Sequence, residues 1–230
     1  MNFKNQDVFV VGSGGSLAGF DFSILKDQQV IAVNHAYKLT PHTLHTFYDS
    51  SFLQEARKDG YRWDKHTAHI LAGRNTGCLA SDKVTLYRRA SYVTSQIKDG
   101  LYIGYSSAQA GINYALINGA RNIYMLGIDC KFLTPSEVRR AAELNGNTKA
   151  ADDILKGAEF AHHVTQQTTE HTMNTRDKER KYTQAAPQFN VFAGRNVFNC
   201  SRFSNLQLPF KDIKDIIKPA KKFTSKLDSV

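Results

Sequence analysis

Short apolar runs recur along the chain, and turn residues bound each of them. The runs are Val8–Val11, Val30–Val33, Leu44–Tyr48, His69–Ala72, Ile123–Leu126 and Val197–Cys200. Their length and boundaries are typical of strands, and longer stretches with helical patterns separate several of them. Strands that alternate with helices favour a parallel sheet wrapped by helices. The sequence therefore predicts one Rossmann-like α/β domain over residues 1–230, with a mostly parallel sheet flanked by helices.

One helix is predicted directly before the fifth run. The stretch SAQAGINYALING, from Ser107 to Gly119, places Ala110, Tyr114 and Ile117 on one face at helical spacing. Gly119 is a natural stop, because glycine readily adopts the left-handed conformation that ends helices. We therefore expect a helix that leads into the following strand.

Residues 134–188 differ in character, being polar, rich in Thr, Gln, Lys and Arg, and poor in β-branched aliphatic runs. Thr134 can cap a helix and Glu137 can complete a capping box, so a first helix should run from here to Asn145–Asn147. A second helical stretch is expected from about Asp152 to Gln167. A polar helical insertion beside an α/β site is often a mobile lid, and residues 134–188 are predicted to be one.

Residues 210–230 form a basic C-terminal tail. An apolar stripe lies opposite lysines at helical spacing: Phe210, Ile213, Ile216 and Ile217 against Lys211, Lys214 and Lys218. Pro219 would break such a helix. The stripe can lie on an interface or pack on the body of the protein. We expect residues 211–226 to lie on the surface and to hold a polyanion, either nucleic acid or an anionic membrane face.

Composition places the chain among ordinary globular proteins, with 41% hydrophobic and 22% charged residues. No stretch has the roughly 18 consecutive apolar residues of a spanning helix, and residues 1–7 do not resemble a signal peptide. A cytoplasmic location is expected. Cys78, Cys130 and Cys200 are widely spaced and odd in number, so we expect reduced thiols.

The formal net charge is +9 and the pI is about 9.4. A basic surface attracts polyanions, including nucleotides, nucleic acid and acidic lipid headgroups. Basic charge also serves solubility in many small proteins. The charge therefore narrows the class of partner without indicating a reaction.

A glycine-rich turn follows the first predicted strand. Its residues are Gly12, Ser13, Gly14, Gly15 and Ser16. Glycines allow tight turns in which main-chain N–H groups approach a phosphate, and a following helix N-terminus favours the same ligand. The turn is neither the full dinucleotide fingerprint nor a P-loop. It is predicted to bind the phosphates of a nucleotide, with a purely structural turn as the alternative.

Polar residues end the next two predicted strands. Asn34 follows the second strand, and Asp49 follows the third. Open α/β sheets bind ligands at the carboxyl ends of their strands. Asn34 can therefore bind a base or a ribose, and Asp49 can accept a hydrogen bond from a sugar hydroxyl or hold a metal, although either residue can instead cap a turn.

A further cluster surrounds the predicted helix at residue 107 and the strand that follows it. Ser106 and Ser107 stand at the helix start, where serine can cap the helix and can also offer its hydroxyl to a phosphate. Gly127 and Asp129 lie just past the next strand. Asp129 is predicted to face the ligand, with a role as a turn former as the alternative.

These stretches resemble a known family. VFVVGSGGSLAGFDFS, VIAVNHAY, TFYDSS and SSAQAGINYALINGARNIYMLGIDCKF look like the corresponding stretches of bacterial CMP-sialic-acid-dependent sialyltransferases. They are also similar to phage and bacterial proteins grouped with 6-hydroxymethyl-dihydropterin diphosphokinase-like enzymes. The likeness covers Val8 to Phe132 with gaps and returns at VFNCSRFSNLQ.

The resemblance implies roles for several of these residues. The glycine-rich turn and Asn34 would hold the nucleotide, Asp49 would face the donor sugar, and Ser107 would contact the nucleotide or donor. Lys131 stands where the sialyltransferases have a catalytic-site tyrosine. A lysine there can neutralise charge that develops on a leaving phosphate.

The same family uses a histidine of its lid-like region as general base. The candidates are His162, His163 and His171, and His171 lies nearest the expected distance before the last strand. Histidine suits this task because its pKa lies near working pH. Each of the three can also be an ordinary surface histidine. Their spacing matches no recognised metal-ligand pattern, so no metal site is predicted.

The sequence leaves four functions open. The first is a glycosyltransferase with a CMP- or UDP-type nucleotide-sugar donor, in which His171 deprotonates the acceptor. The second is a diphosphokinase or other phosphotransferase, in which Asp49 and Asp129 hold Mg²⁺ beside ATP. The others are a nucleic-acid-modifying transferase and a non-catalytic nucleotide-binding module. No cofactor is expected with certainty, and a homo-oligomer is compatible with the sequence.

Overall fold

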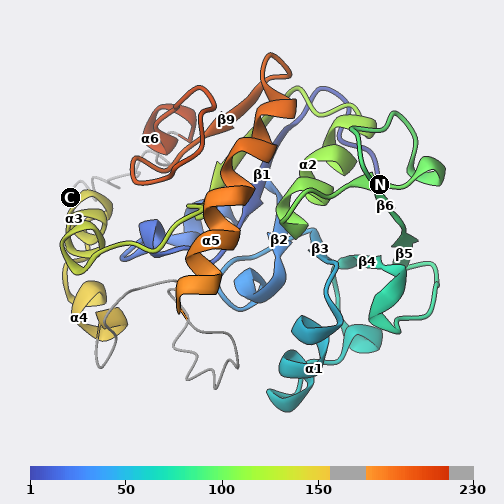
Figure 1. The fold of residues 1–230 in the computed structure, drawn as a ribbon, viewed down its shortest axis with the longest axis horizontal. Helices are drawn as coiled ribbons and strands as arrows, with labels where there is room; N and C mark the ends of the chain where they lie inside the picture. The colour runs from blue at the N-terminus through green and yellow to red at the C-terminus, as the bar shows by residue number, and fades with distance from the viewer. Residues whose placement is uncertain (156–174, 218–230) are drawn as a thin grey trace, which may run out of the picture.

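A computed structural model describes residues 1–155 and 175–217. Its centre is a seven-stranded sheet in the order β5-β4-β3-β2-β1-β8-β9, with every neighbouring pair parallel (Figure 1). The strands are β1 (Asp7–Val11), β2 (Gln29–Val33), β3 (Leu44–Phe47), β4 (His69–Gly73), β5 (Val84–Tyr87), β8 (Asn122–Leu126) and β9 (Val197–Asn199). A separate parallel pair joins β6 (Arg89–Ala90) to β7 (Leu101–Tyr102). The predicted α/β class and parallel sheet are confirmed.

All six strands predicted from apolar runs are present, and most boundaries agree within one residue. The sequence analysis missed β5, β6 and β7. These strands are short, and β6 and β7 have only two residues each, which is too few for a period-2 pattern.

The order of the strands reverses next to β1. From β1 the chain proceeds through β2, β3, β4 and β5 in one direction, whereas β8 and β9 lie on the other side of β1. The register pairs Val11 with Ala32 of β2 and with Leu126 of β8, so the carboxyl ends of the three strands are level. Ligands of open α/β sheets bind at the carboxyl edge where the strand order reverses.

Six α-helices are described, and several connections between strands use short 3₁₀ helices instead. The α-helices are α1 (Ser50–Lys58), α2 (Ser107–Ile117), α3 (Pro135–Asn145), α4 (Lys149–Leu155), α5 (Thr175–Ala185) and α6 (Ile213–Ile216). The 3₁₀ helices are η1 (Gly15–Leu17), η2 (Phe22–Leu25), η3 (Asn34–Lys38), η4 (Trp63–Lys65), η5 (Arg74–Thr76), η6 (Ile97–Asp99) and η7 (Ala186–Phe192).

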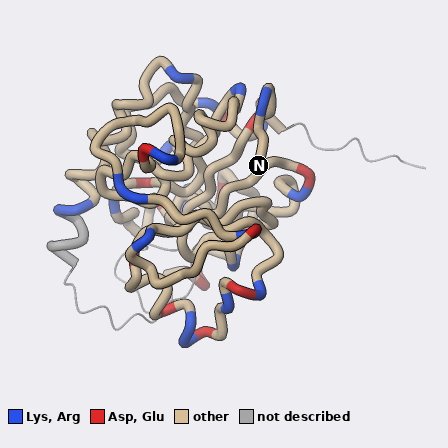
Figure 2. Tube along the Cα trace, turned by 90° about the vertical axis from the view of Figure 1, so that its right-hand side faces the viewer, with Lys and Arg blue, Asp and Glu red and all other residues tan. Residues whose placement is uncertain are grey.

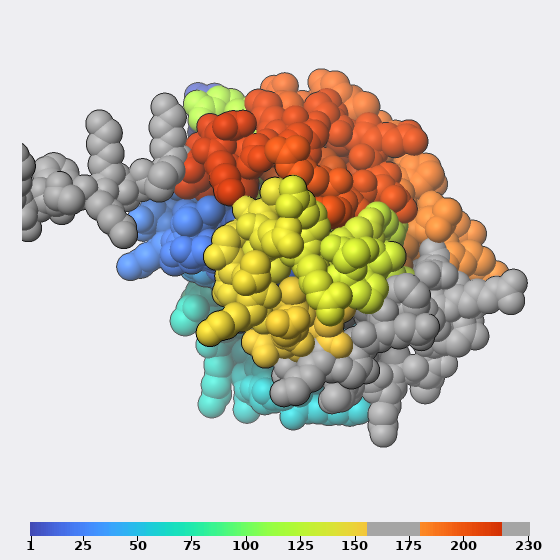
Figure 3. Space-filling view, turned by 90° about the vertical axis from the view of Figure 1, so that its left-hand side faces the viewer, coloured from blue at the N-terminus to red at the C-terminus, as the bar shows by residue number. Residues whose placement is uncertain are grey.

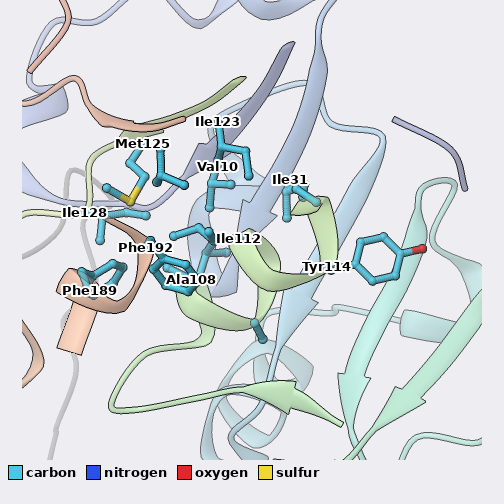
Figure 4. Close-up of a cluster of buried hydrophobic side chains, with 14 of the residues drawn as sticks. Val10, Ile31, Ala108, Ile112, Tyr114, Ile123, Met125, Ile128, Phe189 and Phe192 are labelled. Carbon is cyan, nitrogen blue, oxygen red and sulfur yellow. The ribbon is translucent and has the colours of Figure 1, made fainter. Parts of the chain in front are cut away.

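The largest apolar cluster lies between one face of the sheet and the pair α2 and η7. Figure 4 shows its strand residues Val10, Ile31, Ile123 and Met125 near Ala108 and Ile112 of α2 and Phe189 and Phe192 of η7. Alternate residues of β1, such as Phe9 and Val11, pack into a second cluster on the opposite face. Because both faces are covered, β1, β2 and β8 are apolar at each of their four fully buried positions, whereas β3 also buries His45 and Thr46.

The predicted helices are confirmed where the structure describes them. Helix α2 begins at Ser107, and Gly119 adopts φ +81° just past its end. Helix α3 has the predicted capping box between Thr134 and Glu137 and the predicted end. Helix α4 begins at Lys149, three residues before the expected start, and residues 156–174 lie outside the described part of the chain. Figure 3 shows α3 and α4 beside the segment that leads to α6.

The described part of the tail packs on the body of the protein. Its helix α6 has only four residues, and Ile213 is buried in the second apolar cluster. The expected stripe is incomplete, because Phe210 is exposed and lies against the Arg202 guanidinium. Lys211 lies over the Phe198 ring, so part of the lysine face contacts protein. Polyanion binding stays a prediction, and residues 218–230 lie outside the described part.

Charged residues are dispersed on the side of the molecule that Figure 2 draws. In Figure 2, Lys and Arg are scattered around the face that carries β4 and β5, and several stand next to Asp or Glu. No helix in residues 1–155 or 175–217 is long and apolar enough to cross a membrane. Cys78, Cys130 and Cys200 are free thiols, in agreement with the sequence analysis.

Candidate functional site

The carboxyl ends of β1, β2 and β3 bring several of the predicted site residues to one edge of the sheet. The register of β1 and β2 pairs Val11 with Ala32, so the glycine-rich turn and Asn34 both follow directly on strands that end level with each other. Ser107, at the start of α2, accepts a hydrogen bond from the Tyr48 N–H at 3.1 Å, which holds that helix start against the end of β3. The sequence-predicted residues of the turn, the second and third strands, and the α2 start therefore share this edge.

The glycine-rich turn does not form the open phosphate cradle that the sequence analysis predicted. All five of its residues are buried. The N–H groups of Gly12 and Gly14 donate to the carbonyls of Leu126 and Gly127, at 2.8 and 2.9 Å. The Ser16 N–H donates to a carboxylate oxygen of Asp129. Three of the N–H groups expected to bind phosphate are therefore bonded within the protein.

Asp129 faces this turn and its carboxylate bonds within the protein, which fits the alternative structural role better than the predicted ligand contact. The side chain is 4% exposed, and it accepts hydrogen bonds from the Ser16 N–H, the Ser16 hydroxyl and the Ser201 hydroxyl at 3.0, 2.6 and 3.0 Å. Burial raises the pKa of its carboxyl, and the serine hydrogen bonds act in the opposite direction. The carboxyl fastens the turn after β1 to the loops after β8 and β9.

The glycines of the turn permit this close packing. A Cβ atom on Gly14 would lie 2.5 Å from the Asp129 carboxylate, and one on Gly12 would overlap the Gly127 carbonyl. Gly127 has φ +63°, and a Cβ there would overlap the Leu17 side chain. These glycines allow loop-to-loop approach, and a bulky residue at Gly14 would disturb the turn itself.

Asn34 is the predicted residue whose geometry best fits ligand contact. Its backbone adopts φ +49°, a left-handed conformation that asparagine tolerates better than most residues. Its amide oxygen is buried and has no hydrogen-bond partner. Its main-chain carbonyl accepts a hydrogen bond from Nε2 of His45 at 2.8 Å. Asn34 therefore holds an unsatisfied acceptor at the carboxyl edge of the sheet.

Asp49 lies at the same edge, opposite helix α5. The side chain is exposed, but nearby protein atoms partly desolvate the carboxyl and raise its pKa, while the charge of Lys181 lowers it. Lys181 belongs to α5, whose Tyr182 packs edge-on against Phe132, with ring centroids 5.4 Å apart. The C-terminal half of α5 thus lies between the end of β3 and the loop after β8, and Figure 1 draws the helix across the sheet.

Lys181 was missed by the sequence analysis. It lies among many charged residues of a polar helix, and neither spacing nor composition distinguishes it from its neighbours. Only the packing of α5 brings its charge close to Asp49.

The loop before α2 is fixed by hydrogen bonds and exposes an aromatic ring. The Gln109 side-chain oxygen accepts from the N–H groups of Gly104, Tyr105 and Ser106 at 2.8, 3.0 and 3.2 Å. Arg89 donates to the carbonyls of residues 103 and 104. Ser106 caps the helix through its hydroxyl. Tyr105 is 55% exposed on this ordered loop, and sequence analysis did not identify it.

The remaining catalytic candidates are Lys131 and the three histidines, and the structure describes only the first of them. Lys131 forms an ion pair with Glu137 at 2.6 Å, so its charge is engaged at the start of α3. His162, His163 and His171 lie outside the described residues. Within residues 1–155 and 175–217, no group of three or more His, Cys, Asp or Glu side chains is arranged to hold a metal ion.

The structure defines a parallel α/β protein with a polar candidate site at the edge where its strand order reverses. No family model matches the chain, and no curated protein matches it. Among solved structures, one match is the Maf glycosyltransferase from Magnetospirillum magneticum AMB-1. The match has a TM-score of 0.43 and 17% sequence identity, and it covers 59% of this chain and 24% of that one.

Proposed function

We propose that this chain is a transferase, and specifically a glycosyltransferase that binds a nucleotide-sugar donor at the carboxyl edge of β1, β2 and β3. The observation that carries the proposal is the buried, unpartnered amide oxygen of Asn34. A buried acceptor without a partner costs about 1–3 kcal/mol. Ribose and sugar hydroxyls, or a base amine, can donate to it, so a donor of this class would satisfy it.

Other residues at the edge suit the remaining parts of such a donor. Asp49 can accept from sugar hydroxyls, and Lys181 supplies positive charge near them for a phosphate. Tyr105 offers an exposed ring on which a base can stack. The N–H groups of Gly12, Gly14 and Ser16 already bond within the protein, so in this proposal they do not bind the phosphate. The glycine-rich turn instead supports the loops around the site.

His171 is the proposed general base. In the proposed reaction, the acceptor oxygen attacks the anomeric carbon of the donor sugar while His171 takes the acceptor's proton. The bond from the anomeric carbon to the phosphate oxygen breaks, and the nucleotide leaves with the electron pair. Lys181 can offset the charge that develops on the leaving phosphate.

The test compares nucleotide binding by the wild type and by Asn34→Gly. Glycine adopts positive φ without strain, so this variant removes the amide and keeps the backbone. CMP, UDP, GDP, ADP and ATP, each with and without Mg²⁺, are screened by thermal shift and then by calorimetry. We expect a CMP- or UDP-type ligand to raise the melting temperature of the wild type, and Asn34→Gly to weaken its binding about tenfold.

Asn5→Gly is the matched control, because Asn5 also has positive φ (+61°) and is exposed before β1, away from the site. It should bind nucleotide as the wild type does. Stabilisation by Mg²⁺-ATP alone would favour a phosphotransferase. An absence of stabilisation by every nucleotide would refute the proposed donor site.

A further inference from the structure

We propose that His45 is a positioning residue for the candidate site. As a neutral imidazole with its proton on Nε2, it holds Asn34 in the left-handed conformation that presents the amide at the sheet edge. Its importance for ligand binding rests on the proposed function, whereas its hold on the Asn34 backbone does not. His45 itself is fully buried in β3 and would not touch the donor.

Two hydrogen bonds fix the tautomer of the His45 ring. Nε2 lies 2.8 Å from the Asn34 carbonyl oxygen, and because a carbonyl can only accept, Nε2 carries the hydrogen. Nδ1 lies 2.7 Å from the Tyr61 hydroxyl. In a neutral ring Nδ1 is then an acceptor, so the Tyr61 O–H donates to it. The order of donation is Tyr61 to His45 to Asn34.

The bond to Asn34 acts on a strained residue. A left-handed conformation costs a non-glycine residue of the order of 1 kcal/mol or more, and it persists where surrounding contacts determine it. The His45 bond fixes the orientation of the peptide that follows Asn34. It thereby influences the direction in which the Asn34 side chain leaves the backbone.

The surroundings of His45 keep the ring neutral. Tyr37, Phe47 and Phe52 pack against it, with ring centroids 5.1 to 5.5 Å away. Burial is the main cause that places the pKa of His45 well below its usual value, and the neighbouring His42 lowers it further. The hydrogen bond to Asn34 acts in the opposite direction without overcoming burial.

The other titratable groups around His45 do not favour its protonation. Those that face it or its immediate neighbours are His35, Tyr37, Lys38, His42, Glu55, Asp59, Tyr61 and His66. The two carboxylates have other partners, since Glu55 lies 3.5 Å from His35 and Asp59 pairs with Lys38 at 2.6 Å. Burial lowers the pKa of His66 to about 4. The imidazoles and phenols around His45 are therefore uncharged at neutral pH, because the pKa values of the histidines are lowered and those of the tyrosines are raised.

The tautomer is tested by long-range ¹H–¹⁵N NMR on the intact chain. We expect the His45 ring to show a proton on Nε2 and none on Nδ1, unchanged from pH 8 to pH 5. A proton on Nδ1, or titration of His45 near pH 6.5, would overturn the proposal.

Two substitutions of His45 test the positioning role. His45→Gln can place an amide N–H near the former Nε2 and so retain the bond to Asn34, whereas His45→Leu removes it. We expect the carbonyl ¹³C shift of Asn34, and the affinity for the best-bound nucleotide of the screen, to stay near wild type in His45→Gln. In His45→Leu the shift should change and the affinity should fall about tenfold.

Phe47→Leu is the control for general loosening, because Phe47 lies on the same strand and packs on the same ring. If Phe47→Leu lowers the melting temperature as much as His45→Leu and also moves the Asn34 shift, His45 has only a packing role and the proposal fails. If the wild type binds no nucleotide, the proposed function fails, and the Asn34 shift still decides the positioning role. If nucleotide binds but the His45 variants leave shift and affinity unchanged, only the positioning role fails.

Discussion

Ser16→Ala tests the conclusion that a buried carboxylate at Asp129 holds the glycine-rich turn. The substitution removes the 2.6 Å hydrogen bond from the Ser16 hydroxyl and leaves the bonds from the Ser16 N–H and the Ser201 hydroxyl. A hydrogen bond to a charged group contributes about 1.5–3 kcal/mol. For a chain of this size, each kcal/mol changes the melting temperature by about 2–4 °C. We therefore expect a decrease of about 3–12 °C near neutral pH.

Thr43→Val is the control. It replaces a hydroxyl with a methyl group and removes a 3.1 Å hydrogen bond to the neutral carbonyl of Val30, while the Thr43 N–H keeps its own bond to that carbonyl. A neutral hydrogen bond contributes about 1 kcal/mol, so this variant should lose roughly 2–4 °C. The two variants and the wild type are compared by calorimetry and by chemical denaturation. Equal losses in the two variants would refute the idea that the Ser16 hydroxyl bonds an ionised carboxylate.

The pH dependence of the Ser16→Ala loss provides a second check. Burial raises the folded-state pKa of Asp129 above its unfolded value of about 3.8, so the folded state binds the extra proton and this group stabilises the fold as pH falls through that window. Removing the Ser16 hydroxyl raises the folded-state pKa further, because that hydroxyl lowers it. The stability difference from wild type should therefore be largest above the folded-state pKa values and shrink as pH falls through them. A difference that grows on acidification would contradict this reasoning.

The remaining predictions concern a glycine, an aromatic ring and the proposed base. Chemical denaturation should show that Gly127→Ala destabilises the fold by clearly more than Gly146→Ala. Both residues have positive φ, but of the two only Gly127 has close neighbours at the Cβ position. Equal losses of unfolding free energy in the two variants would contradict the close-packing argument. If a base stacks on Tyr105, calorimetry should show that Tyr105→Ala weakens nucleotide binding about 5- to 100-fold. The control is Tyr92→Ala, which removes another exposed ring and should leave nucleotide affinity unchanged. His171→Ala should lower turnover by roughly 10² with nucleotide affinity retained, and an unchanged rate would exclude it as the base.

Local patterns in the sequence determined the main elements of the fold. The runs that became β1, β2 and β8 are apolar at successive positions because both faces of those strands are covered, and this pattern is visible without knowledge of the partners. The capping box of Thr134 and Glu137 spans only four residues, so its physical cause is contained in the local sequence. Asn34 was recognisable from local sequence as well, because it directly follows the apolar run of β2.

Tertiary structure alone decided which polar groups are available to a ligand. Asp129 and Ser16 lie 113 positions apart in the chain, and their pairing turns a predicted ligand contact into a structural one. Lys181 reaches Asp49 only through the packing of α5. A buried polar group must find a partner, and a loop's N–H groups bond to whichever acceptors the fold brings near them. Residue type and spacing therefore predicted the edge of the sheet that carries the candidate site, while long-range pairing determined which side chains remain unsatisfied there.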